Sequence, residues 1–282
     1  MKIALEPALV ERARSGELAA LDALLRAIQG PIYNLAVRML GRREDAQDAT
    51  QEILLKVTTH LGSWRGESAF GTWVWSVASH HLLNQATRSP QRAEVSFDAL
   101  AERLDAGSAF AERAAEQGGA ALSPEDKLEA RRTALACTQA MLMCLNRPLR
   151  LAYVLDVIFG LESPHASAVQ GITPAAHRQR VARARSAVHG FMEQRCGLVA
   201  ASAACSCAKQ LPAKRLAGSR GTLPPGLQVS DTELDQAERG LRELLAMGDA
   251  AAVMRGAPAY AAPEAMLRGI RLVVEHSGML RL

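Results

Sequence analysis

The chain has 282 residues, with 33 lysines and arginines against 29 aspartates and glutamates, and a net charge of +4. This length accommodates two ordinary domains, and 49% hydrophobic with 22% charged residues is typical of soluble globular proteins. No apolar run approaches the roughly 18 residues that span a bilayer, and the N-terminal residues lack the pattern of a signal peptide. Five cysteines, an odd number without a secretion signal, indicate a reducing, cytoplasmic setting.

Short motifs of common enzyme classes are missing from the sequence, including the Walker A, HExxH, GxSxG and GxGxxG patterns. Their absence lowers the expectation of an enzyme, and no cofactor is expected. Three tryptophans lie between positions 64 and 75, so the scarce aromatic residues are concentrated in one segment.

Apolar residues recur at helical spacing through most of the chain, whereas the period-two alternation of strands is missing, and this predicts an all-α fold. In the first third, the expected helices are 8–28, 32–40, 43–61 and 70–85, with Gly30-Pro31 ending the first of them. Later helices are expected at 124–145, 149–159 and 163–195, the last interrupted by a short turn. Two more are expected in the tail, after a capping box at Ser230 and Glu233 and after Pro263.

Two stretches read as linkers. Between Glu94 and Glu129 there are nine acidic and three basic residues together with several glycines, which predicts a mobile acidic linker with short helical turns at most. A second stretch, between Cys196 and Pro225, is rich in Gly, Pro, Ser and basic residues and also reads as a linker.

The segment 166–185 has the pattern of a helix-turn-helix. Gly171 permits a left-handed turn, Thr173 is a natural N-cap and Pro174 a natural first helical residue. Helical periodicity assigns His177, Val181, Ala184 and Val188 to a buried face. The opposite face is centred on Gln179 and Arg183 and flanked by Arg178 and Arg180, while Arg185 lies nearer the buried edge. Such a basic helix either docks in a major groove or is an ordinary solvated face.

Two features precede this motif. In the expected helix 43–61, Asp45, Asp48 and Glu52 share one stripe, which is either solvated surface or a docking face for a basic partner. The segment 64–75 combines a polar loop with aromatic residues that either pack in a core or hold an unstacked base.

In combination, these features resemble a bacterial RNA polymerase sigma factor of the sigma-70 superfamily, extracytoplasmic-function class. Three segments carry the resemblance in the family's order: 45–57 (DAQDATQEILLKV), 64–78 (WRGESAFGTWVWSVA) and 172–185 (ITPAAHRQRVARAR). The segments 137–153 and 196–207 further resemble a subgroup with a CGLV…CxC ending. Departures from the family pattern include Trp64 in place of Phe, His80-His81, the irregular start of 163–170, and His177 in place of an apolar residue.

The resemblance implies a division into parts and a set of contacts. The expected parts are sigma region 2 (8–88), an acidic linker (89–123), a helix-turn-helix sigma region 4 (124–207), a basic linker (208–229) and a helical C-terminal extension of unknown role (230–282). Core polymerase would be contacted by Asp45, Asp48, Gln51 and Glu52. The −10 element would be contacted by Arg65, Gly66, Glu67, Ser68, Phe70 and Trp73, and the −35 element by Thr173, Arg178, Gln179, Arg180, Arg183 and Arg185. Expected partners are core RNA polymerase and promoter DNA, with an anti-sigma factor as a further candidate and no membrane insertion.

The cysteines leave two interpretations open. Cys137 and Cys144 fit buried structural thiols, and no metal is expected there. Cys196, Cys205 and Cys207 with His189 could instead form a zinc site or a redox switch, although their spacing is not a standard zinc motif.

Two alternative functions also remain. A conventional helix-turn-helix regulator would explain 174–185 but neither the acidic stripe nor the tryptophan segment. A diverged sigma-like module could bind polymerase or a regulator without recognising promoters.

Overall fold

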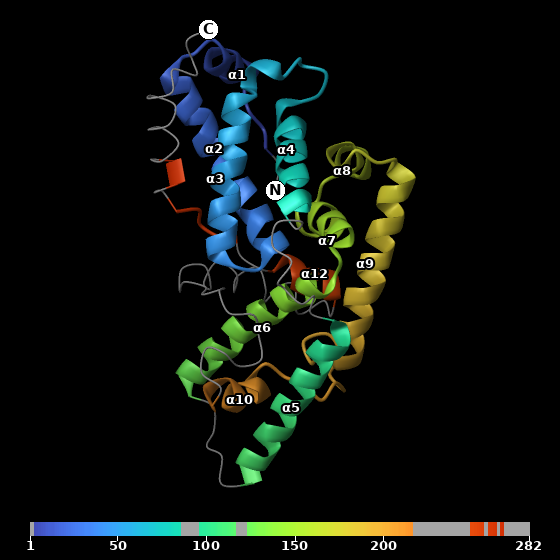
Figure 1. Ribbon diagram of the computed structural model, residues 1–282. Coiled ribbons are helices and arrows are strands. Elements are labelled where there is room, and N and C mark those ends of the chain that lie inside the picture. Colours follow the sequence, from blue (N-terminus) through green and yellow to red (C-terminus); the bar gives the residue numbers. More distant parts are fainter. Residues whose placement is uncertain are drawn as a thin grey trace. The chain divides into compact units, whose positions relative to one another are not determined.

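The computed structural model describes residues 3–85, 96–116, 123–216, 249–256, 259–263 and 266–267. These residues fall into two compact units. The first takes its residues from 1–91, 154–180 and 260–282, and the second from 92–153 and 181–259. No strand occurs among the described residues, where a single isolated bridge joins Cys196 to Cys205. The predicted all-α fold is therefore confirmed (Figure 1).

The first unit is built on a group of packed helices. Its elements are α1 (Pro7–Arg14), α2 (Leu18–Leu40), α3 (Arg43–Thr59), α4 (Phe70–Asn84), a π-helical turn (Val154–Ile158), α8 (Ser163–Gln170) and the first turns of α9 (Pro174–Arg195). Helix α2 packs on α1 and α3, and α4 packs on α3 and α8. Ile28, Ile53 and Val74 are fully buried in this core, and each such side chain contributes roughly 1.5–3 kcal/mol through burial.

Two of the expected helix boundaries in this unit are wrong. The expected helix 8–28 is split between α1 and α2, because the chain leaves helical geometry at Ser15 and Gly16. Conversely, Pro31 does not separate two helices but lies inside α2. A proline inside a helix costs about 3 kcal/mol, but Ile28 and Ile32 are both fully buried on either side of it, so packing holds the two halves in line.

A short C-terminal segment is bound to α2. Tyr260 and Asn34 exchange two hydrogen bonds of 2.8 Å, from the Asn34 amide to Tyr260 O and from Tyr260 N to Asn34 Oδ1. Arg38 is 3% exposed and donates to Asn34 Oδ1 at 2.9 Å, while its guanidinium lies 5.1 Å from the Tyr260 ring and 5.5 Å from the Phe159 ring. Three sequence-distant segments of this unit therefore meet at one buried arginine.

The second unit is likewise helical. Its elements are α5 (Phe97–Glu116), α6 (Pro124–Cys144), α7 (Arg147–Tyr153), α9 from residue 181 on, a 3-10 turn (Ala208–Gln210), α10 (Leu211–Leu216) and α12 (Ala250–Arg255). Helices α5, α6 and α10 pack on one another, with the 3-10 turn against α5 and α6. None of the helices in the described part of the chain has the length and hydropathy of a membrane span.

Both linker predictions need correction in the described parts. Residues 97–116 form the 20-residue helix α5 rather than short turns, because Leu100, Ala101 and Leu104 bury one face. Residues 208–216 form helical turns that pack on α5 and α6, because Leu211 and Gln210 are buried there. The tail helix expected after Ser230 lies outside the described residues, as does most of the one expected after Pro263.

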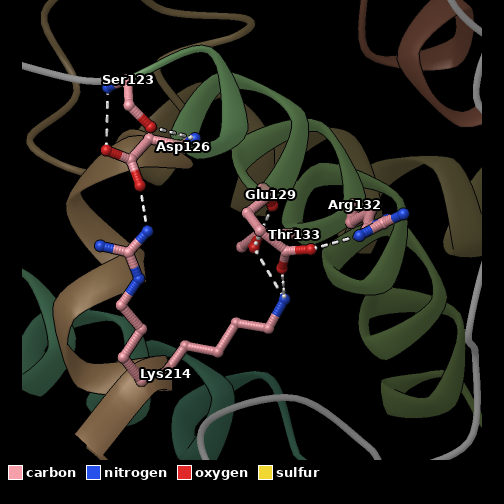
Figure 2. A network of polar contacts seen from close by, with 7 residues as sticks. Ser123, Asp126, Glu129, Arg132, Thr133 and Lys214 are labelled. Carbon is pink, nitrogen blue, oxygen red and sulfur yellow. Dashed lines mark hydrogen bonds and ion pairs between the residues drawn. The ribbon is translucent and has the colours of Figure 1, made fainter.

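Helix α6 is fixed at both ends. At its start, Ser123 and Asp126 form a capping box, with Asp126 N donating to Ser123 Oγ and Ser123 N to Asp126 Oδ2 (Figure 2). At its end, the buried Arg150 donates to the carbonyl oxygens of Leu142, Met143 and Leu145 at 2.7, 2.9 and 2.8 Å. The last carbonyls of a helix lack the usual partner within it. Arg150 supplies a donor to Met143 O and Leu145 O and a second donor to Leu142 O, which also accepts from Leu145 N at 3.1 Å.

Replacing Arg150 by Leu should therefore lower the free energy of unfolding by about 3 kcal/mol, because three hydrogen bonds from one buried side chain are lost at once. Urea unfolding followed by circular dichroism measures this change. The matched control is Arg113→Leu at an exposed position of α5, which should change the stability by less than about 0.5 kcal/mol. Equal stability of the two variants would contradict the capping role of Arg150.

Candidate nucleic-acid interface

The acidic residues of α3 lie as the sequence pattern predicts. Asp48 and Glu52 are exposed, Asp45 and Gln51 are partly exposed, and the opposite side of the helix is buried through Ala49, Ile53 and Val57. Glu44 and Asp45 occupy the first turn, where carboxylates stabilise the helix dipole. The helix therefore presents carboxylates to solvent on a rigid element.

Glu52 also faces the neighbouring helix. Its Oε2 lies 3.7 Å from Nε2 of the buried His81 on α4, and the Lys56 ammonium donates to Nδ1 of the same ring at 2.8 Å. Glu52 nevertheless stays 51% exposed. Its position is thus set by α4, while one side of the carboxylate remains open to a partner.

The segment before α4 forms an exposed polar loop. Gly66 adopts φ +75, and all the residues from Arg65 to Ala69 are exposed, with Arg65 at 83% and Glu67 at 79%. The indole Nε1 of Trp64 donates to Ser68 O at 3.2 Å, and this hydrogen bond joins the two ends of the loop. Arg65 Nη1 and Glu67 Oε1 are 4.0 Å apart, too loosely paired and too exposed to stabilise the loop appreciably. The loop is therefore a solvent-accessible set of donors and acceptors.

The aromatic residues divide into core and surface. Phe70 and Trp75 are buried, and Trp75 packs against Phe159 with ring centroids 5.5 Å apart. Trp64 and Trp73 are half-buried, and each lies 5.4 Å from the Phe70 ring. Core packing thus accounts for two of these four residues, whereas Trp64 and Trp73 are partly exposed, with the Arg14 guanidinium 5.9 Å from the Trp64 ring centroid.

A groove of about 560 Å³ runs beside Trp73, and sequence reasoning did not identify it. Its wall includes Trp73, Ser76 and His80 of α4 together with Lys56 and His60 from the end of α3. The groove combines an aromatic face with imidazole and ammonium groups, which is the chemistry that binds single-stranded nucleic acid. Helical spacing of Trp73, Ser76 and His80 along α4 was the signal in the sequence, whereas the approach of α3 is a tertiary feature.

The helix-turn-helix is confirmed as α8, a turn at Gly171 with φ +63, and α9. Thr173 caps α9, since its Oγ1 accepts from Ala176 N at 3.2 Å. His177 is fully buried, and its Nδ1 is 2.8 Å from Gln170 Nε2 and its Nε2 is 3.4 Å from Asp156 Oδ2. A polar ring replaces an apolar residue here because hydrogen bonds satisfy both nitrogens.

The basic side chains of α9 differ in availability. Arg178, Gln179, Arg183 and Arg185 are exposed. Arg180 is partly buried and donates to Gln170 Oε1 at 3.3 Å, so part of its hydrogen-bonding capacity is used inside the protein. The buried positions Val181, Ala184 and Val188 match the predicted inner face. Three arginines and a glutamine are therefore exposed on α9.

Comparison with known proteins finds a family and several relatives that this chain resembles. The sequence model of the family "Sigma-70 region 2" matches residues 24–91, which include α3, the polar loop and α4. The RNA polymerase sigma-H factor of Pseudomonas aeruginosa is 29% identical over 184 residues, which is 64% of this chain and 90% of the relative. The ECF RNA polymerase sigma-E factors of Escherichia coli K12 and of Salmonella typhimurium are each 29% identical over 188 residues, with the same shares covered.

Proposed function

The chain is a sigma factor of the extracytoplasmic-function class of the sigma-70 family, and we propose how its parts share the work of starting transcription. A sigma factor directs core RNA polymerase to promoters, and its contribution is binding rather than catalysis. The observation that carries the proposal is the order of three surfaces on one chain: an acidic helix, a polar loop beside aromatic rings, and a basic recognition helix.

We assign polymerase binding to the exposed face of α3, through Asp45, Asp48, Gln51 and Glu52. Exposed carboxylates on a rigid helix suit a partner with a basic surface, because complementary charge guides association and fixes orientation. The exposure of Glu52 supports this assignment, since half of its side chain is open to a partner.

We assign the −10 element to the polar loop and to the groove beside Trp73. An unpaired base of the melted strand would lie against the half-buried rings of Trp64 and Trp73, and its polar edge would meet Arg65, Gly66, Glu67 and Ser68. Flipping a base costs a few kcal/mol, which stacking at about 1–3 kcal/mol per base offsets. Phe70 acts from the core by packing against both tryptophans, and Lys56 supplies positive charge and His80 an imidazole along the groove.

We assign the −35 element to α9. Gln179 and Arg183 at the centre of the exposed face would read base edges, and Arg178, Arg185 and the capped N-terminus at Thr173 would contact phosphates. Arg180 would assist by holding Gln170.

For the domain organisation we propose region 2 at 8–88, region 4 at 124–207 and a C-terminal extension at 230–282. The segments between them, 89–123 and 208–229, include the packed helices α5 and α10 and are therefore not simple linkers. An anti-sigma factor that covers the acidic face of α3 or the exposed face of α9 is the additional partner that these surfaces fit. Core polymerase and promoter DNA place the protein's action in the bacterial cytoplasm.

Reconstitution tests this function directly. The full chain is mixed with core polymerase, the complex is isolated by size exclusion, and transcription is assayed on a pool of promoter fragments. We expect a stable complex and specific transcripts that depend on the chain. Binding to duplex DNA without polymerase would instead indicate a conventional regulator, and a polymerase complex without transcripts would indicate a module that does not recognise promoters.

A further inference from the structure

Four of the five cysteines meet at one cavity in the second unit. The cavity has a volume of about 90 Å³ and is lined by Cys137 of α6 and by Cys196, Cys205 and Cys207, which follow α9. We refer to these four residues as the thiol cluster. The fifth cysteine, Cys144, lies two turns from Cys137 on the same helix but does not line the cavity, and its thiol donates to Ala140 O at 3.3 Å.

The segment 196–210, here called the hook, folds back so that its later cysteines return to the first. Gly197 N donates to Cys205 O at 2.9 Å, and Cys196 and Cys205 pair in the isolated bridge. A Cβ at Gly197 would lie 2.8 Å from Cys205 O, so the close approach requires glycine. The backbone itself therefore brings together cysteines that are separated by eight residues.

Side chains then fasten the hook to the two helices around it. Gln210 Nε2 donates to Leu104 O at 3.0 Å and to Ser108 Oγ at 3.1 Å, both on α5. Directly after the hook, α10 is bound to α6: Lys214 Nζ reaches Glu129 Oε2 at 3.0 Å and Thr133 Oγ1 at 3.4 Å, and Arg215 pairs with Asp126 (Figure 2). Helix α6, which carries Cys137, is thus also the helix that binds α10, the segment directly after the hook.

We propose that Cys137, Cys196, Cys205 and Cys207 bind one zinc ion as a closed tetrathiolate site that joins the hook to α6. Zinc takes four sulfur ligands in tetrahedral structural sites, and the reaction releases four protons as four thiols become ligands. As the side chains are placed among the described residues, no group of three or more Cys, His, Asp or Glu could hold a metal ion, so the proposal requires the cysteine side chains to move. With Zn–S bonds of about 2.3 Å, the sulfurs would converge by side-chain rotation, for which the cavity leaves room.

His189, a candidate ligand by sequence, is not part of this site. Its Nε2 lies 3.2 Å from the Tyr153 hydroxyl, and it does not line the cavity. Cys137 takes its place, from a helix that precedes the hook by more than fifty residues.

Metal analysis of the full chain tests the proposal. The protein is purified under reducing conditions, its zinc content is measured by mass spectrometry, and apo protein is titrated with Co²⁺ as a spectroscopic probe. We expect about one zinc per chain and an intense near-ultraviolet thiolate-to-cobalt band. The variants Cys137→Ser and Cys207→Ser should lose most of the zinc, whereas Cys144→Ser and His189→Ala should keep it.

Wild-type protein with neither zinc nor the cobalt band overturns the proposal, however the variants fold. A disulfide among the four cysteines, seen as a loss of two hydrogen atoms in the intact mass without metal, overturns it as well. Loss of zinc in Cys144→Ser equal to that in Cys137→Ser would assign the ion elsewhere. None of these measurements depends on polymerase or promoter, so they stand apart from the test of the proposed function.

The site also predicts a pH dependence. Because four thiol protons leave as the four sulfurs become ligands, the apparent affinity for the metal should rise with pH and fall steeply on acidification, by up to ~10,000-fold per pH unit. Cobalt titrations of the wild type at a series of pH values measure this slope. A slope near zero would contradict thiol ligands.

Discussion

Charge reversal of Asp48 and Glu52 to Lys should lower the affinity for core polymerase by at least ~100-fold, the largest effect we expect from a surface change on this protein. The two carboxylates are exposed on α3 and their helix is anchored from behind by Ile53 and Val57. Close charge pairs at protein interfaces contribute about 1.5–7 kcal/mol each, so replacing two attractive contacts by repulsive ones should exceed the ~2.8 kcal/mol that corresponds to 100-fold. Fluorescence anisotropy of labelled sigma factor titrated with core enzyme measures the change.

The control is Glu11→Lys on α1, which reverses one charge where the double variant reverses two, at an exposed position outside the matched region 2. It should leave the affinity within about twofold of the wild type. Circular dichroism should show unchanged helicity in all variants, because none of these side chains is buried. Wild-type affinity of the double variant would mean that polymerase binds another face of the chain.

Much of the fold could be predicted because periodicity and end signals agreed. Helices α3, α4 and α6 begin and end within two residues of the expectation, since each combines an apolar face with a clear start or stop. Pro31 shows the limit of this reasoning. A proline normally ends a helix, but residues buried on both sides of it kept α2 continuous, and such packing is visible only in three dimensions.

The acidic stretch between Glu94 and Glu129 was wrongly predicted to be a linker, because its composition hid a helix that tertiary packing stabilises. Its composition suggested a linker, because many acidic and small residues cannot by themselves form a core. Leu100 and Leu104 nevertheless share a face and are buried, and Gln210 from the hook donates to the backbone of α5. The helix depends on a partner segment about a hundred residues further along the chain, which no local pattern could indicate.

The candidate sites also divide into those that local sequence predicts and those that depend on tertiary packing. The helix-turn-helix was predictable because its turn, cap and buried face are all local, and even His177 lies where the periodicity placed it. The thiol cavity was only half predicted, because Cys137 joins the hook through tertiary packing. The groove beside Trp73 was missed, since it needs α3 and α4 together.

Promoter recognition by α9 should separate into two kinds of contact. Arg183→Ala should lower the affinity of the holoenzyme for the −35 element by about 10–100-fold, because a bidentate arginine contact discriminates bases by about 1–3 kcal/mol. The loss should be accompanied by relaxed preference at one base pair. Arg178→Ala should instead weaken binding to all sequences alike and reduce the slope of log affinity against log salt by about 1, as removal of a phosphate contact does.

Binding of holoenzyme to a set of single-substituted −35 duplexes, at several salt concentrations, distinguishes these outcomes. Both arginines are exposed and lie on the same helix, so folding and polymerase affinity should be unchanged, and the pair serve as controls for each other. Arg178 and Arg183 are five residues apart on α9 and lie on different sides of its exposed face. Equal effects of the two substitutions on base preference would therefore mean that α9 does not enter the groove in the proposed orientation. Unchanged promoter affinity of Arg183→Ala would remove this residue from recognition altogether and leave the basic face of α9 as solvated surface.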